Sequence, residues 1–478
     1  MTTVRQLADQ AFSRAAGASL IEGNSVRLLR DARENYPAWL EAIGSATRHI
    51  HFENYIFYDD ETGVRFADAL IGKAQAGVRV RLIYDWLGCI GSASRGFWNR
   101  LRSGGVEVRC YNPPRLESPL AWLSRDHRKM LAVDGVVGFI TGLCIGRRWE
   151  GIPEKNIEPW RDTGIEVRGP AVAEIEASFA QIWALTGNAL PTEDPIDKIA
   201  SGGNVALRIV ATAPATAGLF RLDQLVAALA RHRLWLTDAY YAGTPAFVEG
   251  LRAAAKDGVD VRLLMPSASD VLLVQPLSRT GYRPLLEAGV RVFEWNGTML
   301  HAKTAVADGR WARVGSTNLN IASWFGNCEL DAVIEDKLFA QQMEQMYLED
   351  LANATEVVLD ERSKPRAPGR PPHRRVRSIR GGGSAGRAAA GAVRIGNAIG
   401  AVFTNRRSLG PIEARIALTT GVLLCALAIV FALFPQVLAY PLVVVAAWSG
   451  IALVYRGYRL HRARTKEVAA SVQPASKT

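Results

Sequence analysis

Two copies of one short pattern carry the residue types in this chain that are best suited to chemistry. The pattern is His-x-Lys-x4-Asp, and its two copies are His127, Lys129 and Asp134, and then His301, Lys303 and Asp308. Histidine serves as nucleophile, acid or base near neutral pH. Residues two apart on a β-strand point to the same face, so each histidine and its lysine can converge on one anion, for which a phosphate is the obvious candidate. The duplicated pattern therefore predicts one site shared by two related halves.

The two aspartates of the pattern have a different expected role. Each lies seven positions after its histidine and would face away from it on a continuous strand. Each is followed by glycine, and an Asp-Gly pair between apolar runs is typical of a β-hairpin turn. Asp134 and Asp308 stay among the candidate catalytic residues of the motif, but a turn-forming or lysine-orienting role is the favoured interpretation.

The sequence around the two copies repeats as well. Residues 77–82 (GVRVRL) resemble 258–263 (GVDVRL), and residues 105–108 (GVEV) resemble 289–292 (GVRV). Each half then reads as strand, helix, strand, helix, strand and motif hairpin. This pattern predicts the α/β class, with two pseudo-symmetric halves of mixed β-sheet flanked by helices. The expected boundaries are an N-terminal segment at 1–20 and halves at 21–190 and 200–355.

Positive charge is concentrated towards the C-terminal end. The chain has a formal net charge of +11, yet residues 362–411 hold twelve lysines and arginines and no acidic residue. Residues 456–478 are also basic, so residues 1–361 are left with a small net negative charge. A nucleic-acid groove needs a basic surface on the folded body. Nucleic acid is therefore not expected as a partner.

Two apolar runs without charged residues, 416–434 and 437–455, lie between the basic segments. As helices each would extend roughly 28 Å, close to the thickness of a bilayer. Pro435 and Pro441 favour a transmembrane helical hairpin over 416–455 rather than one long helix; a pair of buried helices in a soluble domain is the alternative. Arginines on both flanks place the catalytic body on the cytoplasmic side of the cell inner membrane.

The flanking basic segments have their own expected roles. Residues 362–412 are interpreted as a Pro/Gly-rich linker and residues 456–478 as a cytoplasmic tail. Their charge density would also attract them to an anionic membrane. The loop at 112–125 carries Trp122 among prolines, and either dips into the membrane interface or packs on the body.

The remaining cysteines and histidines indicate no metal or disulfide framework. The five cysteines are scattered without a CxxC pair, and the N-terminus lacks a secretory signal pattern, so reduced thiols in the cytoplasm are expected. His49 and His51 lie in an apolar run and are interpreted as packing or surface residues rather than ligands. We expect no metal and no other cofactor.

Several longer motifs carry a family resemblance. They are RDHRKMLAVDG and MLHAKTAVADG around the two patterns, GSTNLN at 315–320, NCEL at 327–330, FENYIF at 52–57 and WRDTGIEVRGPAV at 160–172. On these motifs the chain resembles the phospholipase D superfamily and, within it, the bacterial cardiolipin synthases, over roughly residues 20–350.

The resemblance implies a membrane-bound phosphatidyltransferase. One phosphatidylglycerol would donate its phosphatidyl group to another through a phosphohistidine, releasing glycerol without nucleotide or metal. Lys129 and Lys303 would hold the phosphate oxygens, and His127 is our choice of nucleophile. The resemblance adds three supporting residues: Asp162 and Glu329 would orient the histidines, and Asn318 would contact the phosphate. Cys144 stands in the first half where Asn318 stands in the second, which departs from the family pattern.

Three other functions compete with this one. A phospholipase D that hydrolyses phosphodiester lipids to phosphatidic acid is the closest rival, because acceptor preference depends on the shape of the site. A nuclease of the same superfamily would need a basic body, which the charge distribution disfavours. A catalytically silent membrane scaffold would more naturally have lost a histidine or lysine, and all four are present.

Overall fold

A computed structural model describes residues 4–114, 123–191, 201–270, 278–359, 406–408 and 410–437, with short stretches between 439 and 458. The chain divides into two compact units. The first comprises Met1–Tyr111 with Arg125–Glu413, and the second comprises Asn112–Ser124 with Ala414–Thr478. Both copies of the His/Lys pattern belong to the first unit, which is described below by itself.

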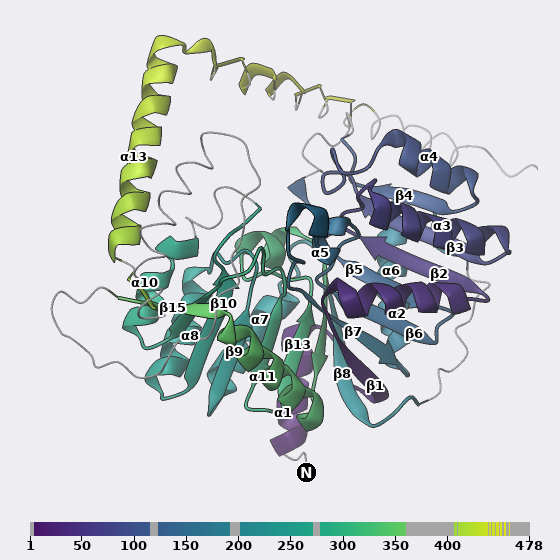
Figure 1. Cartoon of the computed structure of the whole chain (residues 1–478), viewed down its shortest axis with the longest axis horizontal. Helices are drawn as coiled ribbons and strands as arrows, with labels where there is room; N and C mark the ends of the chain where they lie inside the picture. The colour runs from purple at the N-terminus through teal and green to yellow at the C-terminus, as the bar shows by residue number, and fades with distance from the viewer. Residues whose placement is uncertain are drawn as a thin grey trace, which may run out of the picture. The chain divides into compact units, whose positions relative to one another are not determined.

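One mixed β-sheet forms the centre of the first unit (Figure 1), and its described strands number sixteen. Outward from its middle, the first half runs β1 (Ile21–Arg30), β7 (Thr163–Arg168), β6 (Val137–Thr141), β5 (Lys129–Val133), β2 (His49–Asn54), β3 (Arg79–Asp85) and β4 (Glu107–Tyr111). The second half runs β8 (Val205–Thr212), β14 (Glu329–Ile334), β13 (Trp311–Gly315), β12 (Thr304–Ala307), β9 (Arg233–Thr237), β10 (Asp260–Pro266) and β11 (Arg291–Trp295), and then adds β15 (Ala354–Val358) and β16 (Arg406–Ser408). The strand order repeats, so the sheet consists of two halves of one topology.

The halves are joined where β1 pairs with β8. This pairing is antiparallel, with Ile21 opposite Leu207 and Asn24 opposite Val205, and its register shifts between these two pairs. Within each half the outer strands β2, β3 and β4, or β9, β10 and β11, run parallel, while the motif strands β5 and β12 are antiparallel to their neighbours. Parallel strands need crossover connections, and helices supply those that the structure describes.

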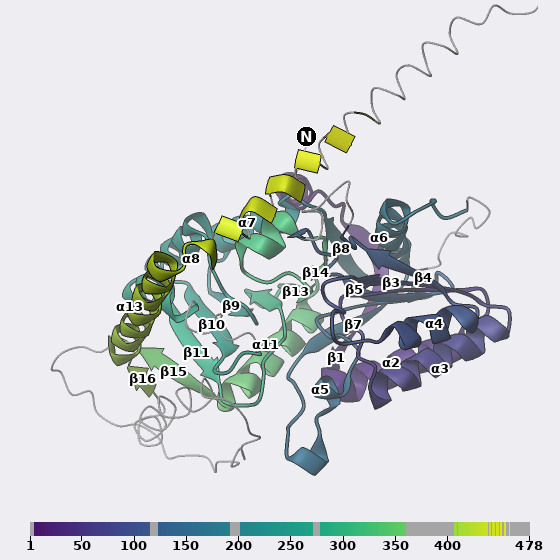
Figure 2. The same cartoon turned by 90° about the horizontal axis from the view of Figure 1, so that it is seen from above.

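Helices cover both faces of the sheet (Figure 2). Consecutive residues of one strand point to opposite faces of the sheet and pack into different cores. On β3, Leu82 belongs to one apolar cluster and Ile83 to another. The three clusters are formed on α2 (Asp31–Ser45), α3 (Glu61–Gln75) and α4 (Arg95–Ser103); on α6 (Ala171–Leu185) and α11 (Lys337–Ala352); and on α7 (Gly218–Leu229), α8 (Pro245–Lys256) and α10 (Tyr282–Glu287). The described part of this unit also contains α1 (Val4–Ala16), α5 (Arg147–Glu150), η2 (Pro153–Lys155) and η3 (Ala322–Gly326). Helix α1 packs on α7.

The two motif hairpins predicted from Asp-Gly are present. β5 and β6 pair in antiparallel register up to Val133 and Val137, and β12 and β13 do the same. Asp134 and Asp308 adopt left-handed backbone conformations, with φ of 56° and 51°. Aspartate tolerates this region better than most residues, and the glycine that follows each of them also has positive φ. The expected α/β fold with two related halves is confirmed.

Only some of the C-terminal residues belong to the described part of the chain. Most of the predicted linker lies outside the described residues, but Arg406–Ser408 form β16 and pair in parallel with β15. Helix α13 (Gly410–Leu433) follows and ends just before Pro435. Among the described residues, no helix has both the length and the apolar character of a membrane span. The expected interfacial loop at 112–125 and the tail at 456–478 also fall largely outside the described residues.

Candidate active site

His127 lies two residues before the start of β5 and contacts a carboxylate from the other half. Its Nδ1 is 2.8 Å from Oε2 of Glu329, the first residue of β14. The same Glu329 oxygen accepts a hydrogen bond from Ser316 at 2.6 Å, and Oε1 accepts one from Asn327 at 3.1 Å. With Nδ1 engaged by a carboxylate, the lone pair of the neutral imidazole is on Nε2. An Nε2 lone pair of this kind is the feature that a general base or a nucleophile requires.

His301 is held in the same way with the halves exchanged. Its Nδ1 is 2.7 Å from Oδ2 of Asp162, a residue of the first half. The indole of Trp149 donates to that oxygen at 3.0 Å, and the Thr163 N–H donates to Oδ1 at 2.9 Å. Each half therefore supplies one histidine and one carboxylate, and each carboxylate orients the histidine of the other half.

Backbone hydrogen bonds also hold each histidine beside the carboxylate of the other half. The N–H of His127 donates to the carbonyl of Cys328, which precedes Glu329, at 2.9 Å. The N–H of His301 donates to the carbonyl of Arg161, which precedes Asp162, at 2.7 Å. Because main-chain atoms set these contacts, the position of each histidine relative to its carboxylate depends on the docking of the halves.

Both motif lysines lie with the histidines. Lys129 and Lys303 are buried, and each ammonium donates to the backbone carbonyl of its own histidine, Lys129 at 2.5 Å. The charge of each lysine depresses the pKa of both histidines, so the two pairs share one electrostatic site. The predicted convergence of His127, Lys129, His301 and Lys303 is what the structure shows.

Burial and the lysines together set the charge states. Burial is the largest cause that lowers the pKa of His127 to about 4, with Glu329 opposing it and Lys129 adding to it. The pKa of His301 is also lowered, first by burial and then by Lys303. Burial lowers the pKa of Lys303 to about 8. Without an anion between the lysines, both histidines are therefore neutral at neutral pH.

The pKa values of the two carboxylates are also lowered, although burial alone would raise them. Burial alone would raise the pKa of Glu329, but His127 and Lys129 outweigh it and the pKa lies below its usual value. The pKa of Asp162 is lowered against burial by His301 and Lys303. Both groups therefore stay ionised and can stabilise an imidazolium.

Asp134 and Asp308 do not join this cluster. Asp134 accepts hydrogen bonds from the backbone N–H groups of Thr47, Arg48 and His49 at 2.7–2.8 Å. Asp308 accepts three equivalent bonds from residues 231–233 at 2.8–2.9 Å. Each aspartate thus ties its hairpin turn to the start of the neighbouring strand, as the favoured turn-forming interpretation expects. The Asp-Gly signal predicted this position, because both aspartates lie in the hairpin turns that follow β5 and β12.

The two halves differ at the position of Asn318. Its Oδ1 is buried and has no hydrogen-bond partner among the described residues, so it is available to a ligand. Cys144, which stands at the same place in the first half, is buried, and its pKa is raised by burial, with Lys129 and Lys303 opposing the rise. The thiol thus lies near both lysines but is a weaker donor than an amide.

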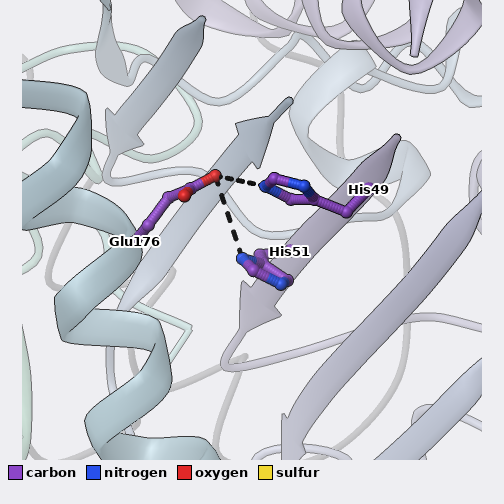
Figure 3. Close-up of side chains that lie close together, drawn as sticks. All are labelled: His49, His51 and Glu176. Carbon is purple, nitrogen blue, oxygen red and sulfur yellow. Dashed lines mark hydrogen bonds and ion pairs between the residues drawn. The ribbon is translucent and has the colours of Figure 1, made fainter. Parts of the chain in front are cut away.

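One cluster of possible metal ligands lies outside this site (Figure 3). Nε2 of His49 is 2.6 Å from Oε1 of Glu176 on α6, and Nδ1 of His51 is 3.9 Å from the same oxygen. All three are buried and their ligand atoms lie within 4.8 Å of one another. Arg81, however, lies 3.4 Å from the other ring nitrogen of His51. Burial, His49 and Arg81 all lower the His51 pKa, and the same guanidinium would repel a divalent cation.

We therefore assign this cluster a structural role. His51 stacks on Phe179 of α6, with ring centroids 4.5 Å apart and planes 8° apart. His49 joins the same helix through Glu176. The pair holds α6 against β2, which agrees with the packing role expected for both histidines. Glu176 had no signal in the sequence, because it is one of two acidic residues on a largely apolar helix and belongs to no motif.

Comparison with known proteins places the chain in a family. The model of the family described as cardiolipin synthase, PLD-like domain, matches residues 39–183 and 226–351. The chain is 34% identical over 358 residues to cardiolipin synthase A of Pseudomonas aeruginosa (strain LESB58), covering 74% of this chain and 72% of that protein. It is 32% identical over 340 residues to the cardiolipin synthase of Alkalihalophilus pseudofirmus, covering 70% of this chain and 67% of that protein.

The fold has a relative of known structure. The phosphatidylserine synthase of Haemophilus influenzae Rd KW20 superimposes with a TM-score of 0.57 at 14% identity, covering 73% of this chain and 91% of that one. At this identity the likeness concerns the fold. The fold and the paired His/Lys site are those of the phospholipase D superfamily. Within it, the chain belongs to the cardiolipin synthase family with PLD-like domains.

Several residues around the histidines were not predicted. Ser316 and Trp149 each donate to the carboxylate oxygen that contacts a histidine. Tyr55 lies against His127, with ring centroids 4.8 Å apart. Tyr55 and Ser316 fall in motifs that carried the resemblance, but Trp149 is in a short helix with no motif of its own. Only the folded chain brings its indole to Asp162.

Proposed function

We propose that this protein is a cardiolipin synthase that transfers a phosphatidyl group from one phosphatidylglycerol to another. The observation that carries the proposal is the pair of buried histidines, each oriented by a carboxylate from the other half and accompanied by a lysine. Two imidazoles with Nε2 lone pairs beside two ammonium groups suit a reaction at the phosphorus of a phosphodiester. One imidazole attacks the phosphorus from one side, and the alcohol departs on the other.

The reaction has two balanced steps. Nε2 of His127 attacks the phosphorus of the donor lipid, and the bond from phosphorus to the glycerol headgroup breaks. The protonated Nε2 of His301 gives its proton to the departing glycerol oxygen. In the second step His301 takes the proton from a glycerol hydroxyl of the acceptor lipid, whose oxygen attacks phosphorus. The bond between phosphorus and His127 breaks, which restores both histidines and leaves cardiolipin.

The remaining polar residues of the site hold and compensate charge. Lys129 and Lys303 would bind the non-bridging phosphate oxygens, and Asn318 would add an amide donor. Because the lysines depress the pKa of both histidines, an anionic phosphate that offsets their charge would raise it again. Substrate binding would thereby help His301 to carry the proton that the first step needs.

Membrane attachment belongs to the proposal as well. Large apolar side chains on α13 are exposed, among them Leu418 (69%), Leu423 (64%) and Leu433 (67%). A helix with such a surface needs an apolar environment, and the charge-free sequence continues to residue 455. We therefore assign residues 416–455 to a membrane hairpin with the catalytic body on the cytoplasmic side of the inner membrane.

The lipid products test this function. The purified full-length protein is incubated with phosphatidylglycerol vesicles in the absence of any cytidine nucleotide, and the lipids and free glycerol are quantified. The proposal predicts equal amounts of cardiolipin and glycerol. Phosphatidic acid without cardiolipin would instead identify a hydrolase, and the absence of any phospholipid product would reject phosphatidyl transfer altogether.

A further inference from the structure

Two tyrosines from opposite halves lie against the two His/Lys pairs. The ring of Tyr55, which follows β2 directly, is 4.8 Å from the ring of His127 with an angle of 68° between planes. The ring of Tyr240, which follows β9, is 5.8 Å from the ring of His301 with an angle of 79°. Each histidine therefore has a tyrosine ring set edge to face beside it.

The same two rings contact the lysines. The ammonium of Lys129 is 5.0 Å from the Tyr55 centroid, and that of Lys303 is 5.6 Å from the Tyr240 centroid. An aromatic face attracts a cation without forming a salt bridge. The lysines are thus held near the reacting centre while their charge stays available to a phosphate.

The hydroxyl groups of both tyrosines are engaged elsewhere. The Tyr55 hydroxyl accepts a hydrogen bond from Arg125 at 2.8 Å, and the Tyr240 hydroxyl donates to Asp270 at 2.7 Å. These bonds fix the orientation of the rings. What the tyrosines present to the histidines and lysines is therefore the ring rather than a polar group.

The duplication of the chain does not by itself produce this arrangement. The turns at Asp134 and Asp308 bind the starts of β2 and β9 in the same way, which makes His49 equivalent to Arg233. Counting from these two residues, the position equivalent to Tyr55 is Ala239, not Tyr240. The two tyrosines therefore occupy non-equivalent positions in the two halves. The duplication alone would have given a tyrosine at equivalent positions, so it does not account for this arrangement.

The rings of Tyr55 and Tyr240 also pack against the same apolar cluster. Tyr240 packs against the apolar cluster of the first half, which Tyr55 also contacts, although Tyr240 comes from the second half. Both residues are half-buried, whereas His127 and His301 are buried, with 7% and 5% of their surface exposed. The tyrosines therefore cover the histidines while remaining partly accessible themselves.

We propose that Tyr55 and Tyr240 are specificity-determining residues that exclude water from the phosphohistidine. This inference rests on the proposed function. The intermediate has two fates: an alcohol oxygen attacks phosphorus and gives cardiolipin, or a water oxygen attacks and gives phosphatidic acid. In both, the bond between phosphorus and nitrogen breaks and His301 takes the proton. Apolar rings beside the reacting atoms disfavour a small, mobile nucleophile and leave the attack to a lipid hydroxyl held in place.

The test is the ratio of phosphatidic acid to cardiolipin, which does not depend on how much protein is folded. Tyr55→Ala and Tyr240→Ala remove a ring and should raise the ratio about tenfold, a change of about 1.4 kcal/mol in relative barrier heights. Tyr55→Phe and Tyr240→Phe keep the ring and should keep the ratio of the unchanged protein. Tyr55→Leu and Tyr240→Leu leave a smaller opening and should give intermediate ratios, which covers the case in which an alanine variant makes no product.

Two results would overturn the inference. One is an unchanged ratio in the alanine and leucine variants; the other is a phenylalanine variant that shifts the ratio as much as alanine does, since the hydroxyl would then be responsible. Failure of the function itself looks different, because the unchanged protein would then make no cardiolipin from phosphatidylglycerol.

Discussion

His127 and Glu329 are separated by 202 positions in the chain, yet their side chains meet at 2.8 Å. The contact crosses from one half of the molecule to the other, and Asp162 and His301 make the same crossing in the opposite direction at 2.7 Å. Neither of these two pairs is therefore complete within one half. The two halves also share one continuous sheet, in which β1 pairs with β8.

Loss of the Glu329 charge should impair catalysis while the site stays assembled. Glu329→Gln keeps an oxygen that can accept from Nδ1 of His127 but no longer stabilises an imidazolium. We expect kcat to fall by up to about 10⁴-fold, the loss seen when the acid of a Ser-His-Asp triad is neutralised. Steady-state kinetics with phosphatidylglycerol vesicles measures this, and Glu349→Gln, an exposed carboxylate with 47% of its side chain accessible, is the matched control. Equal kcat in both variants would contradict the assigned role of Glu329.

Alkaline pH should reduce activity through Lys303. Its pKa is lowered to about 8, mainly by burial, so the free enzyme loses this ammonium as pH rises through that value. We therefore expect kcat/KM to fall above pH 8. In Lys303→Arg the group stays charged, so the alkaline limb should move to higher pH even if the rate is lower. An alkaline limb at the same pH in the arginine variant would assign it to another group.

The hairpin aspartates should matter for stability rather than for chemistry. Asp134→Ala removes the acceptor of three backbone N–H groups and should lower the free energy of unfolding by about 1–3 kcal/mol, with kcat of the folded protein unchanged. Denaturant unfolding and kinetics measure the two effects separately. A large loss of kcat in a fully folded Asp134→Ala protein would return this residue to the catalytic group.

The lowered pKa of Asp134 also predicts the direction in which stability changes with pH. Its pKa is lowered, because hydrogen bonds from His49, Thr47 and Arg48 outweigh the opposing effect of burial. A carboxyl with a depressed pKa stabilises the fold above its unfolded pKa, and this contribution is lost as pH falls through the folded pKa. The stability difference between the unchanged protein and Asp134→Asn should therefore be present at pH 7 and shrink below about pH 4. A difference that grows in acid would contradict the assignment.

Removal of the C-terminal apolar region should release the body from membranes. A chain that ends at Ser408 keeps β16 and lacks residues 416–455. We expect it to move from the membrane fraction to the soluble fraction in sedimentation while its unfolding transition is retained. Chains that end at Ser408 but stay on vesicles in high salt would show that another part of the protein also binds lipid.

The duplicated pattern was enough to predict the fold class and the four central residues. The two-residue spacing joined His127 to Lys129 and His301 to Lys303, and the Asp-Gly turn signal separated Asp134 from them, because these relations are local. The strands β1, β7, β8 and β14 were not predicted, although they join the two halves. Their pairing is long-range, and a single sequence without repeats at those places contains no signal for it.

The same limit applies to the surroundings of the histidines. That Asp162 and Glu329 orient histidines followed from the resemblance, but the exchange between halves did not, since it depends on how the halves dock. Trp149 was missed as a site residue for a related reason, and Tyr240 could equally have lined the site or packed in the core. An aromatic residue that lines a site and one that fills a core look alike in sequence, and only contacts such as the bond from Trp149 to Asp162 distinguish them.

The most direct test of the shared site is to remove each histidine separately. His127→Ala and His301→Ala are compared with His232→Ala, an exposed histidine outside the site, in the formation of cardiolipin from phosphatidylglycerol. Because one histidine forms the bond to phosphorus and the other moves the proton, each of the first two changes should lower the rate at least ~10³-fold. His232→Ala should leave it unchanged. Normal cardiolipin formation in either His127→Ala or His301→Ala would contradict a single site built from both halves.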